Sequence, residues 1–176
     1  EPGAGADPTM LTTRAVREGD EYVINGHKWF SSNGSHADFF IVMVVTDPDA
    51  EAHERASMII VPRDTPGVNV LRDIPVMGLS HAAGDKGHAE ILYQDVRVPA
   101  ANLVGEEGQG FMLAQKRLGP GRIHHAMRWL GQGRRAFDMM CERVVTREVK
   151  GSTLSQKQMI QDMVATSKAE LEAAPP

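Results

Sequence analysis

The chain has 176 residues, with 19 Lys and Arg against 23 Asp and Glu, a formal net charge of -4, 41% apolar and 24% charged residues. This composition is ordinary for a globular protein, and the basic residues are too few and too dispersed for a nucleic-acid-binding surface. A single cysteine, Cys141, excludes a disulfide framework. No apolar run approaches the ~20 residues of a membrane-spanning helix, and no signal peptide is visible.

Residues 1–105 have the pattern of short strands separated by turns. Asn25-Gly26 lies between two β-leaning runs and predicts a two-residue hairpin turn, because both residues tolerate positive φ. The spacing of the runs is typical of a small β-barrel or sandwich. The expected strands are 12–17, 21–24, 27–31, 39–46, 57–62, 68–74 and 88–98.

From residue 106 onwards the pattern is helical. Residues 108–118 predict a helix that ends at Gly119-Pro120-Gly121, and residues 122–146 predict a second, long helix. Ser155 and Gln158 form a capping box, which predicts a third helix to about residue 173. The expected fold class is α+β: a small β-barrel or sandwich domain over 1–105, then two or three helices of an incomplete bundle over 106–176.

Common catalytic motifs are absent. The sequence has no G-x-G-x-x-G, no phosphate-binding P-loop, no H-E-x-x-H and no G-x-S-x-G. The seven histidines are scattered, so we expect no metal site.

One strand is more informative. Strict alternation in residues 27–32 puts Trp29 and Ser31 on one face, and Phe30 and Ser32 on the other. An indole beside a hydroxyl makes a flat surface with a hydrogen-bond donor, which suits a planar heteroaromatic cofactor. The alternative from spacing alone is that Trp29 is ordinary barrel core.

Several motifs in this order resemble the acyl-CoA dehydrogenase family over nearly the whole chain. They are Glu1-Pro2-Gly3-Ala4-Gly5-Ala6-Asp7, then Tyr22-Val23-Ile24-Asn25-Gly26-His27-Lys28-Trp29-Phe30-Ser31-Ser32-Asn33-Gly34, then Asp95-Val96-Arg97-Val98-Pro99, and Gly108-Gln109-Gly110-Phe111. The run Arg122-Ile123-His124-His125 is most similar to the subgroup of long multidomain animal members and their bacterial relatives.

The resemblance implies an FAD enzyme of fatty acid metabolism. It would remove a proton α to an acyl-CoA thioester, pass the β-hydride to flavin N5, and send electrons to an electron-transfer flavoprotein. The family fold is a helical domain, a middle β-barrel and a four-helix bundle, assembled as a homo-oligomer, either dimer or tetramer. These residues would be a fragment, inactive alone, located in the cytoplasm of a bacterium or in a mitochondrion or peroxisome of a eukaryote.

The resemblance also implies site residues. Trp29, Phe30 and Ser31 match the segment in which a Trp lies against the isoalloxazine and a hydroxyl approaches N5, where it stabilises developing negative charge. Arg122 matches an Arg beside the acyl-CoA pocket. Ala6 replaces a frequent Ser that touches both flavin and acyl-CoA.

Arg147 matches the Arg of an R-x-x-F-G motif that reaches the FAD pyrophosphate of a neighbouring subunit, although Lys150 replaces its Phe. Gln158 matches a Gln near the same FAD. Gly121 stands where some branches carry a catalytic Glu, so we expect no catalytic residue in this chain. Residues 80–87 lie where family members often contact CoA.

Two other functions are consistent with these residues. One is a flavin oxidase or hydroxylase on the same fold, because fold does not fix chemistry. The other is a non-catalytic truncated homologue that serves as a binding or subunit-contact module, which the residues Ala6, Gly121 and Lys150 would suit.

Overall fold

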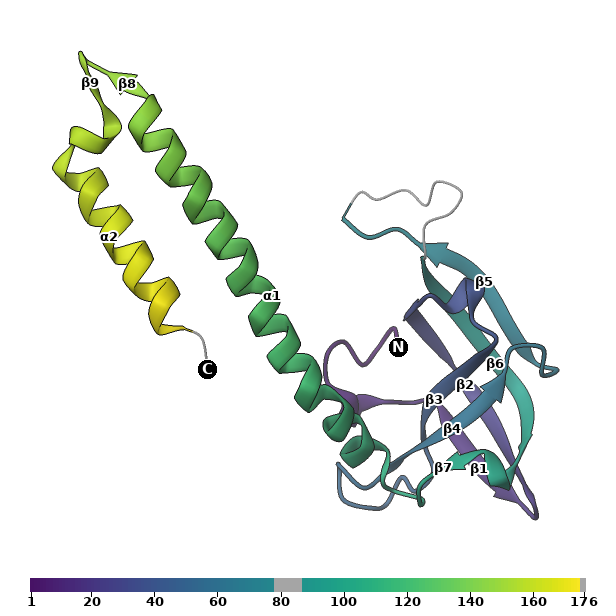
Figure 1. Cartoon of the computed structure of the whole chain (residues 1–176). Coiled ribbons are helices and arrows are strands. Elements are labelled where there is room, and N and C mark those ends of the chain that lie inside the picture. Colours follow the sequence, from purple (N-terminus) through teal and green to yellow (C-terminus); the bar gives the residue numbers. More distant parts are fainter. Residues whose placement is uncertain (78–86, 175–176) are drawn as a thin grey trace. The chain divides into compact units, whose positions relative to one another are not determined.

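The computed structural model describes residues 1–77 and 87–174, and the chain forms two compact units, residues 1–115 and 116–176. The first unit is a seven-stranded sheet in the order β5-β6-β2-β1-β3-β4-β7 (Figure 1). Its strands are β1 (Arg14–Glu18), β2 (Glu21–Ser32), β3 (Phe39–Val45), β4 (Ala56–Pro62), β5 (Val68–Ile74), β6 (His88–Pro99) and β7 (Leu103–Val104). Short 3-10 turns are Pro8–Met10, Gly34–His36 and Ala100–Asn102.

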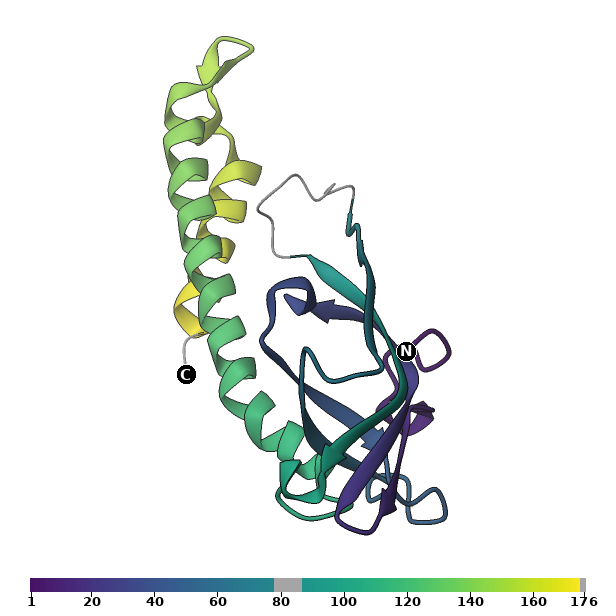
Figure 2. The same ribbon diagram turned by 90° about the vertical axis from the view of Figure 1, so that its right-hand side faces the viewer.

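The sheet curls, as Figure 2 shows, and its buried apolar side chains form one cluster. Phe40 on β3 and Tyr93 on β6 are not on neighbouring strands, yet their ring centroids lie 6.4 Å apart at 90°. Ile24, Ile59 and Ile91 are fully buried in the same cluster. Burial of each such side chain is worth about 1.5–3 kcal/mol, so this unit has a substantial core of its own. The expected barrel-like α+β fold is confirmed.

The expected turn at Asn25-Gly26 is wrong, because both residues lie inside β2. The hairpin between β1 and β2 turns six residues earlier, at Gly19 and Asp20, where Gly19 has a φ of 63°. Gly26 instead serves a close approach: a Cβ built on it would lie 2.3 Å from the Oγ1 atom of the buried Thr13. The small residue is needed for packing rather than for a turn.

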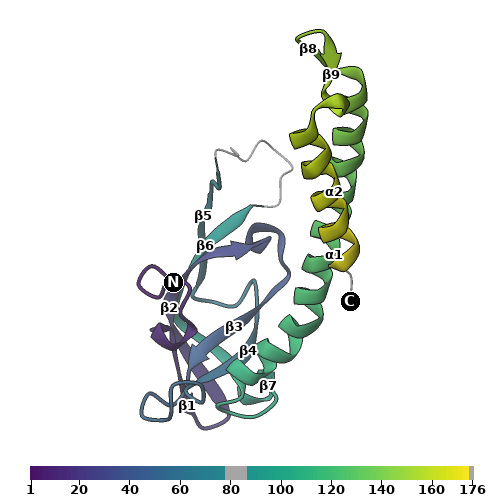
Figure 3. The ribbon, with the colours of Figure 1, turned by 90° about the vertical axis from the view of Figure 1, so that its left-hand side faces the viewer.

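The second unit contains two antiparallel helices. Helix α1 (Gly110–Thr146) begins in the first unit, and α2 (Gln158–Ala173) follows a small hairpin of β8 (Glu148–Val149) and β9 (Ser152–Thr153) and the 3-10 turn Leu154–Gln156. Figure 3 shows the two helices side by side. At the hairpin turn Lys150 and Gly151 have φ of 50° and 74°, the signature of a type I′ turn.

Two expectations about the helices are wrong. The helix does not end at Gly119-Pro120-Gly121, because α1 is one helix of 37 residues that includes Pro120. A proline inside a helix removes one hydrogen bond, and here the long helical segments on both sides outweigh that loss. Ser155 does not cap α2, since Lys157 is the N-cap residue and the Ser155 hydroxyl lies 2.8 Å from Thr153 Oγ1. The chain therefore has two α-helices in its described part, not three.

Across residues 1–77 and 87–174, neither α1 nor α2 combines the length and apolar character that crossing a lipid bilayer requires.

Candidate functional site

The last part of β2 contains a β-bulge that changes which side chains share a face. Lys28 pairs with Ile91 on β6 and Ser31 pairs with Ala89, so three steps along β2 match two along β6. Phe30 has a φ of 54°, a left-handed conformation that few non-glycine residues adopt. The additional residue of a bulge interrupts the alternation of side chains at this point.

The bulge separates Ser31 from Trp29. Directly paired residues of antiparallel strands point to the same side of a sheet, and Ala89 is fully buried, so Ser31 points to the core side. Trp29 lies on the opposite side with His27, whose ring centroid is 6.4 Å away. The expectation that Trp29 and Ser31 share a face is therefore wrong.

The side of β2 and β6 away from the core, here called the outer face, gathers aromatic rings and a hydroxyl. The rings of Trp29 and Phe30 meet edge to face at 5.5 Å, and Phe30 and His88 lie 6.4 Å apart. Ser32 Oγ is 2.9 Å from His88 Nδ1. Trp29 is half-buried and Phe30 is 49% exposed, so these rings are not part of the barrel core.

A buried carboxylate on the outer face joins three strands beside the aromatic rings. Glu90 on β6 accepts a hydrogen bond from Arg72 Nε on β5 at 2.5 Å and lies 2.8 Å from His27 Nε2 on β2. The hydrogen bond from Arg72 lowers the pKa of the Glu90 carboxyl and keeps it ionised. Because the network joins three strands, it fixes the imidazole against which Trp29 packs.

An ion pair anchors the N-terminal segment beside the bulge. Lys28 Nζ lies 2.7 Å from Glu1 Oε1, and the two side chains are 13% and 1% exposed. Burial raises the pKa of the Glu1 carboxyl, but hydrogen bonds from Lys28, Thr12 and Thr13 outweigh burial and lower it to about 2. Burial also lowers the pKa of Lys28, which the pairing with Glu1 opposes. Ala6 lies exposed in the same segment.

Ser31 lines a hollow of about 380 Å³ bordered by β2, β3 and β6. Lys28, Phe40 and Tyr93 also line it, and burial raises the pKa of the Tyr93 phenol. Ser32 borders the same hollow, but its hydroxyl is bonded to His88. The two adjacent serines therefore have different surroundings.

The other predicted residues lie in the helical unit. Arg122 on α1 and Gln158 at the start of α2 are exposed. Arg147 directly follows α1, and Lys150 lies at the tip of the β8–β9 hairpin, so the hairpin presents both exposed cations. Gly121 lies within α1 and offers no side chain that could accept a proton.

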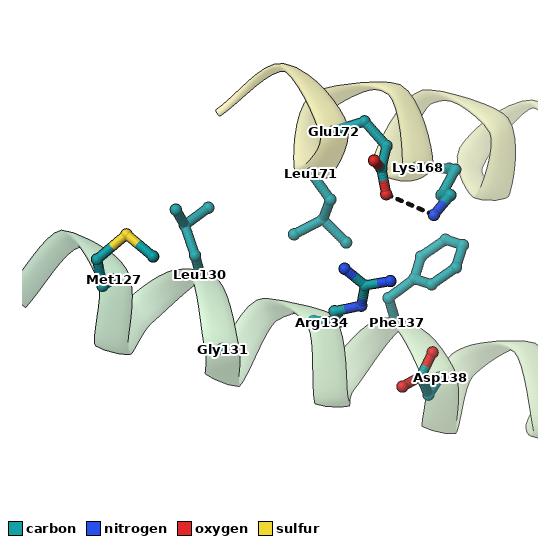
Figure 4. A pocket seen from close by; sticks show the side chains of 9 residues that line it. All are labelled: Met127, Leu130, Gly131, Arg134, Phe137, Asp138, Lys168, Leu171 and Glu172. Carbon is teal, nitrogen blue, oxygen red and sulfur yellow. Dashed lines mark hydrogen bonds and ion pairs between the residues drawn. The ribbon is translucent and has the colours of Figure 1, made fainter. Parts of the chain in front are cut away.

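A cavity of about 260 Å³ lies between α1 and α2. Figure 4 shows Leu171 and Lys168 pointing from α2 toward α1, with Phe137 and Arg134 pointing from α1 toward α2. Lys168 Nζ donates to Glu172 at 2.6 Å and lies 6.0 Å from the Phe137 ring centroid. No predicted site residue lines this cavity, so we assign it to the seam between the helices.

The outer face suits a flat heteroaromatic ring such as flavin. Trp29 and Phe30 offer apolar surface for a ring face, and a hydroxyl at the end of the strand offers a donor for a polar ring edge. Ser32 and His88 were not among the predicted site residues. Their contact joins positions 56 residues apart, so no local pattern in the sequence signals it. Residues 80–86, expected near CoA, lie outside the described residues.

Two protein-family models match the chain. The acyl-CoA dehydrogenase middle domain matches residues 1–96, and the acyl-CoA dehydrogenase C-terminal domain matches residues 108–175. The chain therefore belongs to the acyl-CoA dehydrogenase family of flavoprotein oxidoreductases, as the sequence motifs predicted.

Individual relatives agree. The chain is 47% identical over 173 residues to the probable acyl-CoA dehydrogenase FadE2 of Mycobacterium tuberculosis, covering 97% of the chain and 42% of that relative. It is 41% identical over 173 residues to acyl-CoA dehydrogenase family member 10 of Mus musculus, covering 97% of the chain and 16% of that relative. The chain thus spans less than half the length of these relatives.

Solved structures share the fold. An acyl-CoA dehydrogenase from Geobacillus kaustophilus matches with a TM-score of 0.81 at 38% identity, over 98% of this chain and 45% of that one. The prolyl acyl carrier protein oxidase AnaB matches with a TM-score of 0.83 at 28% identity, over 98% of this chain and 44% of that one. Both matches include the sheet and the helices.

Proposed function

We propose that these residues form the middle domain and the first bundle helices of an FAD-dependent acyl-CoA dehydrogenase. The complete enzyme desaturates an acyl-CoA thioester between the α and β carbons and passes electrons to an electron-transfer flavoprotein. The observation that carries the proposal is the aromatic pair on the outer face of β2, the half-buried Trp29 and the exposed Phe30, in a chain whose family is shown.

FAD, when bound, supplies the acceptor for the hydride that leaves the β carbon. Trp29 and Phe30 would contact the ring system and exclude water from it. A hydroxyl at the end of β2 donates to the ring edge, where a preorganised donor stabilises negative charge. Lys28 and Glu1 hold the N-terminal segment, with Ala6, against the same strand.

The hairpin residues suit the phosphate part of the cofactor. The guanidinium of Arg147 offers paired donors for phosphate oxygens, and the Lys150 ammonium adds a second positive charge. Gln158, the first residue of α2, offers a side-chain amide soon after this hairpin in the chain. Arg122 is assigned to the acyl-CoA pocket, and the base that takes the α-proton is assigned to another part of the enzyme, because Gly121 cannot serve.

We also propose that the enzyme is a homo-oligomer, a dimer or a tetramer. Large apolar side chains along both helices are exposed, including Ile123 at 64% and Met159 at 72%. Association with further protein would bury them.

The test uses the full-length protein that contains these residues. Purified enzyme should be yellow, and anaerobic addition of an acyl-CoA should bleach its flavin absorption. The double variant W29A/F30A should lose bound FAD, whereas V16A, an exposed apolar residue elsewhere on the sheet, should retain it. A colourless full-length protein that takes up no FAD would reject the proposal and favour a non-catalytic module.

The similarity to AnaB favours one second candidate, a flavin oxidase on the same fold. The two enzymes differ in the electron acceptor. Oxygen uptake that matches substrate turnover would identify an oxidase, and turnover that requires an electron-transfer flavoprotein or a dye in its place would identify a dehydrogenase.

A further inference from the structure

The chain contains two Asn-Gly pairs, Asn25-Gly26 and Asn33-Gly34, and the structure holds them very differently. Asparagine followed by glycine is the dipeptide most open to spontaneous deamidation, because glycine has no Cβ to shield its backbone nitrogen. After hydroxide removes its proton, that nitrogen attacks the asparagine Cγ atom; a C–N bond forms, the Cγ–Nδ2 bond breaks, and ammonia leaves. Water then opens the resulting succinimide ring to aspartate or isoaspartate.

Asn25-Gly26 is locked within the sheet. Asn25 Nδ2 donates to Asp95 Oδ1 at 3.0 Å, and Asn25 Oδ1 accepts from the backbone N–H of Asp95 at 2.8 Å. Strand β2 pairs with β1 on one side and with β6 on the other, and Gly26 also packs against Thr13. The attack on Asn25 therefore requires that strand pairing and both side-chain hydrogen bonds break first.

Asn33-Gly34 lies in the turn that follows β2, where the asparagine side chain is free. Asn33 has a left-handed φ of 60° and makes no capping hydrogen bond, and its Oδ1 atom has no partner among the described residues. The hydrogen bonds at Gly34 use its carbonyl oxygen, so its N–H has no acceptor in that same part of the chain. Ser32 and His36, which flank this pair, are exposed to solvent.

One further contact makes the Gly34 amide more acidic. The backbone N–H of His36 donates to the Asn33 carbonyl oxygen at 3.1 Å, in the same peptide group as the Gly34 N–H. A hydrogen bond to that oxygen stabilises the negative charge that forms when the nitrogen loses its proton. The turn thus combines a free side-chain amide, an unbonded N–H and access for solvent.

We propose that Asn33 is a spontaneous modification site, at which deamidation of this chain begins. The reaction adds a negative charge directly after Ser32, the last residue of β2, and isoaspartate also lengthens the backbone by one carbon. Phe30 and Ser32 belong to the outer face, so deamidation at Asn33 should release FAD. This consequence rests on the proposed function, whereas the chemical step does not.

The first experiment follows both asparagines by peptide mass mapping of the full-length protein during incubation in mildly alkaline buffer. Deamidation at Asn33 should be at least about 10-fold faster than at Asn25, because a turn opens locally far more often than a central strand. In concentrated urea the two rates should agree within about 3-fold, since the unfolded chain protects neither asparagine. Equal rates in the folded protein, or faster reaction at Asn25, would overturn the inference.

The second experiment links the modification to FAD. Full-length N33G keeps the left-handed backbone, which glycine adopts freely, but it has no side-chain amide to lose. During the same incubation, the unmodified enzyme should lose FAD in step with conversion of Asn33, whereas N33G should retain it. Equal loss of FAD from both proteins would overturn the link to the flavin site. A freshly purified enzyme without FAD is the separate result that rejects the proposed function, and the mass mapping is independent of it.

Discussion

The sheet unit and the helical unit bury their apolar side chains to very different extents. In the sheet unit, thirteen residues form one buried cluster, and Ile24, Ile59 and Ile91 are fully inaccessible. In the described part of α1 and α2, the one buried residue is Gly110. The sheet unit thus has a packed core of its own, whereas the helical unit leaves most of its side chains at least partly exposed.

Both helices expose large apolar side chains. They are Met112, Leu118, Ile123, Met127, Trp129, Met139, Val145, Met159 and Met163. The two helices contact each other through partly buried residues such as Leu171 on α2. Its Cδ2 atom lies 3.2 Å from the position that a Cβ on Gly133 of α1 would take. Such limited contact gives little stability to two isolated helices.

We expect the largest effect on stability at the Lys28–Glu1 ion pair of the sheet unit. Lys28→Met leaves the Glu1 carboxylate buried without its cation, which should destabilise the chain by about 3–5 kcal/mol in urea unfolding. Adding Glu1→Gln should recover much of that loss. An exposed ion pair contributes only about 0–1 kcal/mol to stability. A loss of stability in that range for Lys28→Met would contradict the burial of the Glu1 carboxylate.

The same pair has a pH signature. The folded pKa of Glu1 is about 2, below its ordinary value of 4.5. Its stabilising contribution is therefore complete above pH 4.5 and is lost as the pH falls toward 2. Urea midpoints of the unmodified chain should fall over that range more steeply than those of Glu1→Gln.

A core substitution should have the next largest effect. Ile91 is fully buried on β6, the strand between β2 and β5. Ile91→Ala should lower the free energy of unfolding by about 2–5 kcal/mol, because it leaves a cavity. Urea unfolding followed by circular dichroism measures the loss. A cost near zero would contradict the close packing inferred for the sheet unit.

The smallest effect is expected on α2. Met163 is 52% exposed, so Met163→Ala should change the unfolding free energy of the isolated chain by less than about 0.5 kcal/mol. In the full-length protein the same substitution should cost more, because added helices or subunits would cover this side chain. Equal, small costs in both proteins would show that this part of α2 stays exposed.

The strands of the sheet unit could be predicted because their signals are local. The apolar run at 39–46 contains β3, and the run at 68–74 coincides with β5. The errors occurred where the surrounding structure overrides a local preference. Thr13 packs on Gly26 and keeps Asn25-Gly26 within a strand, and α1 continues through Pro120.

The candidate site could be predicted only where its signal is local in the sequence. The aromatic pair Trp29 and Phe30 is visible in the sequence, and the structure places the half-buried Trp29 and the exposed Phe30 beside a hydroxyl. The side to which each serine points depends on a one-residue bulge against β6, and β6 lies far along the chain. Alternation alone therefore selects Ser31, whereas the register places Ser32 next to His88.

The methionines on the surface of α1 and α2 have a chemical consequence. Oxidation converts the thioether of an exposed methionine into a polar sulfoxide, which methionine sulfoxide reductases can reverse. Met139, Met159 and Met163 are all more than half exposed, while the isoleucines and valines of the sheet core offer no sulfur to oxidise. Oxidation of these methionines would therefore make the helices less able to associate.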